Sequence, residues 1–129
     1  MKKLGLLLFM MMGLALSVVA ADKSKGSIKF PETLYDFGTI KEDGGKVSHE
    51  FEFKNEGKEP ITITEARAQC GCTTPEYPKG EIKPGESGVI KVTYNPLGRP
   101  GGFTKIVTVR CTGNPGKVNL KIRGTVAPK

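Results

Sequence analysis

The sequence predicts an all-β domain, an antiparallel β-sandwich of about seven strands, behind an N-terminal signal peptide. Three observations predict it. Apolar and polar residues alternate with a period of two through much of the chain, as they do in half-buried strands. Turn signals rich in glycine, proline and asparagine recur about every eight to twelve residues. No segment shows a helical period, and no internal repeat is evident.

The first 21 residues have the layout of a secretory signal. Two lysines precede an uncharged apolar run over residues 4–19, and small residues then offer a cleavage site after Ala20 or Ala21. The alternative is an uncleaved membrane anchor, because the run approaches the roughly 18 residues that suggest a span. The abrupt change to polar sequence at Asp22 favours cleavage. We therefore expect an exported chain, periplasmic or secreted, without membrane insertion after cleavage.

The remaining chain is long enough for one domain with a single core. Residues 22–26 are expected to be a short polar leader, and residues 27–129 an immunoglobulin-like β-sandwich. SIKF and LYDFGTI supply one or two short strands. Residues 46–54 then alternate strictly, which predicts a half-buried strand. Its core-facing side chains are Val47, His49, Phe51 and Phe53.

The next strand is expected at ITITEARAQ, where the apolar positions change phase and predict a bulge near Glu65. Pro75, Pro78 and Gly80 follow the first two cysteines and are typical of a loop. The remaining strands are expected at 89–94, 103–111 and 117–126; their inward residues include Ile90, Val92, Tyr94, Val118, Leu120, Ile122 and Val126.

A family resemblance rests on DFGTI, HEFEFKNEG and the long stretch CGCTTPEYPKGEIKPGESGVIKVTYNPLGRPGGFTKIVTV. Over residues 28–126 the chain resembles the bacterial domain-of-unknown-function 1573 family, which is related to immunoglobulin-like domains of the Hydin and major-sperm-protein type. The resemblance implies an exported immunoglobulin-like sandwich and carries over no activity. His49, Cys70, Cys72 and Gly85 fall on the motif positions of the family, whereas Cys111 does not.

Cys70 and Cys72 lie on either side of one glycine, and three interpretations of the pair remain open. Residues i and i+2 of an extended strand are about 6.6 Å apart, at the limit of disulfide geometry. Gly71 permits a bend that brings them closer. The pair could be two structural thiols, a strained and redox-labile disulfide, or a metal chelate or reactive site.

Cys111 is expected to be an unpaired thiol. Antiparallel pairing of its strand with the strand that precedes Cys70 places it at the opposite end of the sandwich, more than about 20 Å from Cys70. A disulfide needs Cα atoms within about 7 Å. The sequence therefore predicts no bond from Cys111 to either of the other cysteines.

His49 is the only histidine and lies on the apolar face of its strand. The favoured interpretation is a core residue whose ring nitrogens bond backbone groups. The alternative is that it reaches Cys70 or Cys72 from the facing sheet as a third ligand for Cu(I), a soft ion. A closed zinc site would need four ligands, which this chain does not bring together. We expect no cofactor, with Cu(I) as the alternative.

The sequence favours a binding or structural module of the cell envelope over an enzyme. No recognisable catalytic motif can be assembled. The formal net charge of +7 is spread over interleaved lysines and glutamates, without the basic stripe typical of nucleic-acid binding. The partner is an unknown envelope protein or ligand, and the alternative function is a thiol redox or Cu(I) protein using Cys70 and Cys72. Loops 41–45, 70–75 and 95–102 should meet at one pole, with Arg99, Thr73 and Thr74 as candidate binding residues.

Overall fold

The computed structural model describes residues 25–129, so the expected signal peptide and most of the polar leader lie outside the described residues. The described part contains nine strands and no helix. No helix that could cross a membrane is therefore present in residues 25–129. The strands are β1 (Ile28–Lys29), β2 (Leu34–Lys41), β3 (Val47–Asn55), β4 (Ile61–Ala68), β5 (Thr73–Glu76), β6 (Glu81–Ile82), β7 (Ser87–Tyr94), β8 (Gly101–Cys111) and β9 (Lys117–Ala127).

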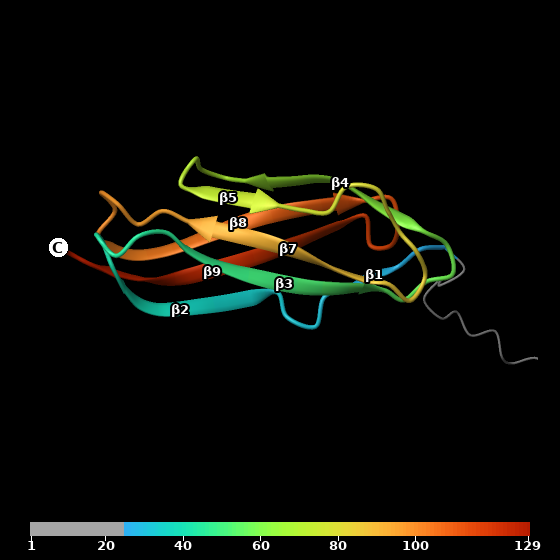
Figure 1. Cartoon of the computed structure of the whole chain (residues 1–129), viewed down its shortest axis with the longest axis horizontal. Helices are drawn as coiled ribbons and strands as arrows, with labels where there is room; N and C mark the ends of the chain where they lie inside the picture. Colours follow the sequence, from blue (N-terminus) through green and yellow to red (C-terminus); the bar gives the residue numbers. More distant parts are fainter. Residues whose placement is uncertain (1–24) are drawn as a thin grey trace, which may run out of the picture.

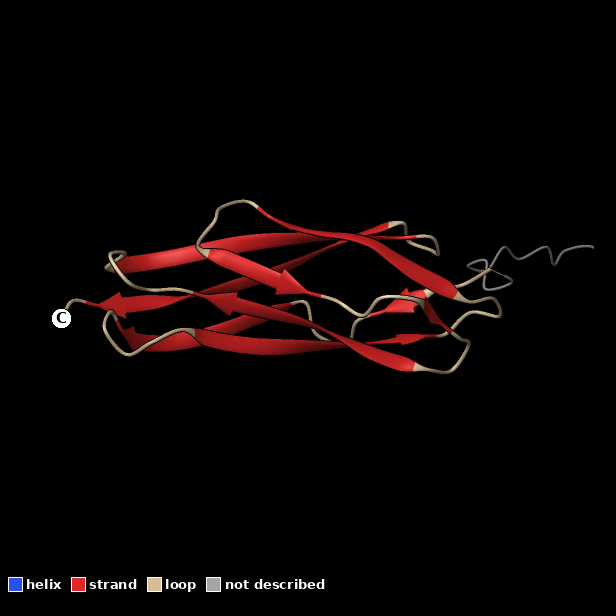
Figure 2. Ribbon diagram, turned by 45° about the horizontal axis from the view of Figure 1, so that its top comes forward, coloured by secondary structure: helices blue, strands red, loops and turns tan. Residues whose placement is uncertain are grey.

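The strands form two sheets that pack face to face, as Figures 1 and 2 show. One sheet has the order β1-β3-β7-β5, and the other has the order β2-β9-β8-β4-β6. All pairs are antiparallel except β2 with β9, which run parallel. The prediction of an all-β sandwich is confirmed. The parallel pair departs from a purely antiparallel arrangement because the chain changes sheets between β1 and β2.

The core consists of the residues that the period-two pattern turned inward. Phe51 and Phe53 of β3 are fully buried, and so are Ile90, Val92 and Tyr94 of β7. The register of β4 against β8 shifts between Ile63 and Glu65, which confirms the bulge. The facing sheet contributes Ile61, Val107, Val109, Leu120, Ile122 and Val126.

The prediction of a loop after the first two cysteines is wrong. Thr73–Glu76 forms β5, which pairs with β7, and Glu81–Ile82 forms β6, which pairs with β4. Pro75 is compatible with a strand here because β5 is at the edge of its sheet, where a residue without an N–H group costs no ladder bond. The chain thus crosses to the sheet of β3 and β7 directly after Cys72.

The two ends of the sandwich are built differently. We call the end where segments 42–46, 69–72 and 95–100 meet the loop pole, and the opposite end the Asn55 pole. The C-terminal strand β9 ends at the loop pole, and β1 begins at the Asn55 pole (Figure 1).

Asn55 organises the Asn55 pole from a fully buried position. Its Oδ1 atom accepts hydrogen bonds from the backbone N–H groups of Ser27 at 3.1 Å and Gly57 at 2.9 Å. Its Nδ2 atom donates to the carbonyl oxygens of Glu59 at 2.8 Å and Ile82 at 2.9 Å. The amide therefore uses two acceptor and two donor positions, and joins Ser27, the turn after β3 and the end of β6.

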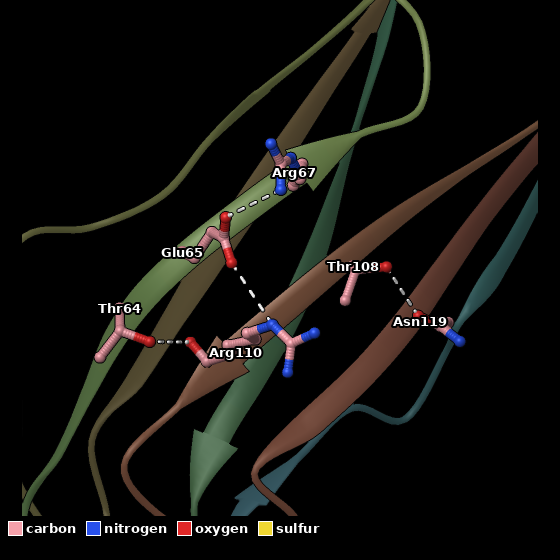
Figure 3. Close-up of polar contacts among 6 residues, drawn as sticks. All are labelled: Thr64, Glu65, Arg67, Thr108, Arg110 and Asn119. Atoms are coloured by element: carbon pink, nitrogen blue, oxygen red, sulfur yellow. Dashed lines mark hydrogen bonds and ion pairs between the residues drawn. The ribbon is translucent and has the colours of Figure 1, made fainter.

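On the outer face of the sheet that contains β4, β8 and β9, several polar side chains bond one another (Figure 3). Glu65 forms ion pairs with Arg110 at 3.3 Å and with Arg67 at 3.9 Å. The Thr108 hydroxyl donates to Asn119 Oδ1 at 3.0 Å. These side chains therefore bond one another, both along β4 and across neighbouring strands.

Candidate functional site

The cysteine pair lies at the loop pole, in the bend that leads from β4 to β5. Cys70 and Cys72 are joined by a disulfide, and their Cα atoms are 5.3 Å apart. The Cys72 N–H group points back at the Cys70 sulfur, with 3.2 Å between N and Sγ. Gly71 lies at the tip of the bend, where a Cβ atom would have no neighbour within 4 Å. Of the three interpretations of the pair, the structure contains the disulfide.

Thr73 and Thr74 follow the disulfide and differ in exposure. Thr73 is buried, and its hydroxyl oxygen lies 3.6 Å from the sulfur of Cys72 and 4.0 Å from that of Cys70. Thr74 is exposed on the outer face of β5. Thr73 therefore packs the disulfide against the domain, and only Thr74 of the two is accessible to a partner.

Backbone and carboxylate hydrogen bonds connect the three loops. The Asn95 N–H group donates to the carbonyl oxygen of Cys72 at 3.0 Å. The Gly98 N–H group donates to Oε2 of Glu42 at 2.9 Å. Glu42 is 8% exposed, and its own N–H group bonds the carbonyl oxygen of Ala127 at 3.0 Å. The structure thus brings together the three loops that the sequence placed at one pole, and fixes them to the end of β9.

The loop between β7 and β8 holds an exposed leucine in a defined conformation. The N–H group of Leu97 donates to Asn95 Oδ1 at 3.1 Å, and Nη1 of Arg99 donates to the Leu97 carbonyl oxygen at 3.1 Å. Despite these bonds, Leu97 is 55% exposed. It borders a surface hollow of about 350 Å³, whose other lining residues are Glu42, Asp43, Gly45, Lys46 and Asn95.

Aromatic packing supports the loop from below. The ring of Tyr94, the last residue of β7, stacks on Phe103 of β8 with 4.0 Å between centroids and 11° between planes. Burial raises the pKa of Tyr94 above its usual value, and the nearby charge of Arg99 opposes that shift. Both rings belong to strands, so the loop begins and ends on a packed pair of aromatic side chains.

His49 packs against β2. Its ring stacks on Tyr35 of β2 at 3.7 Å and 8°, and Nε2 lies 2.7 Å from Oε1 of Glu32. The expectation that the ring nitrogens bond backbone groups is wrong for Nε2, because the turn between β1 and β2 places a carboxylate beside it. The expectation of a core position holds only in part, since His49 is half-buried.

The structure does not bring His49 together with the cysteines. His49 pairs with Val92 of β7, and Val92 pairs on its other side with Pro75 of β5. Two strand spacings, about 10 Å, therefore separate His49 from β5, and the disulfide lies beyond the start of β5. Within residues 25–129, no group of three or more histidine, cysteine, aspartate or glutamate residues is placed to hold a metal ion.

Cys111 lies at the Asn55 pole, opposite Ile63 of β4. It is a free thiol, and its sulfur is 3.5 Å from the carbonyl oxygen of Pro115. Burial raises the pKa of this thiol. The prediction that Cys111 is unpaired and remote from the other two cysteines is confirmed.

Sequence reasoning missed Glu42 and Leu97. Glu42 stood in a turn signal, where an exposed carboxylate is the usual expectation, and its bond to Gly98 joins residues 56 positions apart. Leu97 was part of a proline- and glycine-rich loop. A large apolar residue between two turn residues was the available signal, because turns are usually polar.

Comparison with known proteins finds similarity at the level of family and fold. The model of the family described as "Protein of unknown function (DUF1573)" matches residues 28–126. No curated protein sequence matches the chain.

Solved structures of similar fold come from bacteria and from humans. A protein of unknown function from Porphyromonas gingivalis W83 has a TM-score of 0.69 at 18% identity, over 82% of this chain and 49% of its own; the chain thus spans about half of that protein. A human ASH/PapD-like domain, domain 7 of CEP192, has a TM-score of 0.69 at 11% identity, over 92% and 98%. The YadV chaperone has a TM-score of 0.52 at 17% identity, over 80% and 52%. These identities show a shared immunoglobulin-like or PapD-like fold and nothing more specific.

Proposed function

The chain belongs to the DUF1573 family, whose description assigns no activity, and we propose that it is an exported, non-enzymatic binding module of the cell envelope whose partner contacts the loop pole. Export rests on the layout of the first 21 residues. The partner is an envelope protein or ligand. The surface that it contacts consists of Leu97, Arg99, Thr74 and the hollow beside Leu97.

The observation that carries the proposal is the exposure of Leu97 on a fixed loop. Leu97 leaves 55% of its surface in water in the isolated domain, and covering that apolar surface with a partner would be favourable. Its loop is nevertheless held by bonds to Asn95, Arg99 and Glu42. A surface that is ordered before binding loses less conformational entropy when a partner arrives. Exposed apolar groups beside a hollow on rigid loops are typical of binding surfaces.

The alternative of a redox or Cu(I) protein has no comparable support. Cys72 and Thr73 are buried, and the side-chain groups at hydrogen-bonding distance from the two sulfurs are limited, in the described residues, to the Thr73 hydroxyl. Neither a base nor a third ligand therefore adjoins the pair. In the binding module, the disulfide has the simpler role of fixing the bend between β4 and β5.

A photo-crosslinking amino acid at Leu97 tests the proposal in the exporting cell. The matched control carries it at Leu34, which is 41% exposed and is the other exposed large apolar residue of residues 25–129. We expect one discrete adduct from Leu97 and none from Leu34. The adduct should be lost on Arg99→Ala substitution with the circular dichroism spectrum unchanged. Equal adducts from both positions, or none from either, would overturn the assignment of the loop pole.

Export has its own measurement. Intact mass of the protein from the soluble envelope fraction should correspond to a chain that begins at Ala21 or Asp22. Recovery of the chain with Met1 in the membrane pellet would contradict export as a soluble protein. The crosslinking result does not depend on which of these two residues is the first.

A further inference from the structure

The strand β3 has an edge that no other strand of residues 25–129 covers along most of its length. On one side, β3 pairs with β7 from Val47 to Lys54. On the other side, β1 pairs only with Lys54 and Asn55. The chain then loops outward between β1 and β2 (Figure 1) and joins the other sheet. The uncovered edge of β3 therefore extends from Val47 to Phe53.

The direction of the backbone groups along this edge follows from Asn55. Its N–H group donates to the carbonyl oxygen of Glu86, and its own carbonyl accepts from Gly85, both on the β7 side. Backbone groups alternate in direction along a strand, and β3 has no bulge against β7. Ser48, Glu50 and Glu52 must therefore direct their N–H and C=O groups outward, away from β7.

A line of surface hollows follows this edge. One is lined by residues that include Pro31, Glu52 and Lys54, and the next by Pro31, Glu32, Glu50, Glu52 and Val89 of β7. A third, lined by Ser48, His49, Glu50 and Lys91, continues toward the start of β3. Neighbouring hollows share residues, so together they form one shallow groove along β3 that extends onto Val89 and Lys91 of β7. The stacked rings of Tyr35 and His49 close the inner side of the edge.

Glutamates outnumber lysines only slightly among the residues that line these hollows, Glu32, Glu50, Glu52 and Glu56 against Lys29, Lys54 and Lys91, but the charged side chains on the uncovered stretch of β3 itself are Glu50 and Glu52. Glu50 and Glu52 are exposed on the outer face of β3, and Glu32 lies beside them on the turn after β1. Glutamates on an open edge disfavour pairing with the same edge of a second copy, because like charges would then face each other. The same glutamates favour a strand with basic side chains at the facing positions.

We propose that the free edge of β3 binds an extended peptide segment with lysine or arginine at alternate positions, as an added strand antiparallel to β3 and in line with β1. The backbone groups of Ser48, Glu50 and Glu52 supply the hydrogen bonds, and Glu50 and Glu52 select the basic side chains. This site is separate from the loop pole, so an experiment that contradicts one of the two proposals does not contradict the other.

Two isomeric decapeptides provide a sharp test. Both alternate lysine with threonine, and both are acetylated at the N-terminus and amidated at the C-terminus. In one peptide the backbone nitrogen of every lysine is methylated, and in the other that of every threonine. The unmethylated peptide is the reference. Lysines that face Glu50 and Glu52 must direct their own N–H groups toward β3, because directly opposed residues share both face and edge. We therefore expect the unmethylated and the threonine-methylated peptides to bind the full chain, and the lysine-methylated peptide not to bind.

Charge reversal supplies the second arm. Each opposite-charge pair across strands contributes about two- to five-fold to affinity, so Glu50→Lys with Glu52→Lys should weaken binding by about tenfold or more. The matched control is Glu76→Lys, an exposed glutamate on β5, which β7 separates from β3 in the same sheet. This variant should bind within about two-fold of the wild-type chain. In nuclear magnetic resonance spectra, the amide signals of Ser48, Glu50 and Glu52 should move on binding of the peptide.

Each other result would overturn the proposal. Equal binding of both methylated peptides, or equal loss in the Glu76 variant, would mean unspecific charge attraction. Absence of binding, or self-association of the chain through this edge, would mean that no basic strand is accommodated there. If the double variant does not fold, the comparison of the two methylated peptides on the wild-type chain still tests the proposal.

Discussion

The two poles of the sandwich are held together by opposite means. At the Asn55 pole, one buried amide makes four hydrogen bonds to three segments. At the loop pole, a local disulfide and bonds between loops hold the chain, and Leu97 is left exposed. A buried polar group must be fully satisfied and so tolerates little change, whereas surface loops can vary in sequence while the scaffold persists. From this comparison we expect the Asn55 pole to contribute more to stability, and the loop pole to tolerate more change.

Asn55→Ala should have the largest effect on stability. It leaves two N–H groups and two carbonyl groups without a partner in a buried region, and we expect a loss of about 3–5 kcal/mol in the free energy of unfolding, measured by urea denaturation. The matched control is Asn119→Ala, an exposed asparagine with a hydrogen bond to Thr108. That control should lose about 0.5 kcal/mol or less. Similar losses in the two variants would remove the distinction between the poles.

Replacing Cys70 and Cys72 together with serine should have an intermediate effect. Loop-closure entropy for so short a ring predicts a loss of about 1.5 kcal/mol in the free energy of unfolding. Amide hydrogen exchange should accelerate at Asn95, which bonds the Cys72 carbonyl, and remain unchanged at Gly57 in the other pole. If the variant fails to fold, the disulfide is as central to the fold as Asn55 and the comparison is wrong.

Glu42→Ala should lower the free energy of unfolding by less than the loss of the disulfide does. The carboxylate accepts from Gly98 at 2.9 Å near the surface, so we expect a loss of about 1 kcal/mol and faster exchange of the Gly98 amide. Glu86→Ala is the control, because Glu86 accepts from Lys83 at 2.8 Å in an exposed turn of the Asn55 pole. The exchange rate of Gly98 should not change in that control. An unchanged Gly98 amide in the Glu42 variant would mean that this bond does not fix the loop.

Leu97→Ser should have the smallest effect on stability. An exposed side chain outside the core is expected to change the free energy of unfolding by less than about 0.5 kcal/mol. The measurement is again urea denaturation, with Leu34→Ser as a companion of similar exposure. If the free energy of unfolding falls by more than about 1 kcal/mol in the Leu97 variant alone, Leu97 packs on the domain and is not an exposed contact for a partner.

The parts of the fold that depend on local pattern could be predicted from the sequence. Alternation placed Phe51, Phe53 and Val92 in the core, and the change of phase near Glu65 predicted the bulge. The strand β5 could not be predicted, because Pro75 breaks a strand pattern unless the strand is at an edge, and edges are decided by the whole sheet.

The candidate site was predictable in position and not in chemistry. Strand directions gathered the three loops, and the spacing of Cys70 and Cys72 allowed the disulfide that the structure contains. The hydrogen-bond partner of His49 could not be predicted from the sequence, because Glu32 approaches it only where the chain changes sheets. Asn55 had a readable signal in Asn-x-Gly, since its side chain bonds the N–H group two residues on, but that motif does not reveal burial.

The parallel pair of β2 and β9 determines how this domain responds to pulling. Lys25 is tied to the Asn55 pole through its bond from Lys58, whereas Ala127 lies at the loop pole beside Glu42. Tension applied between the two ends would draw β2 and β9 in opposite directions along their length. The hydrogen bonds from Leu34 to Lys41 would then be loaded together, in shear, and would not open one after another. We therefore expect the domain to resist stretching along its long axis, because β2 and β9 run in the same direction.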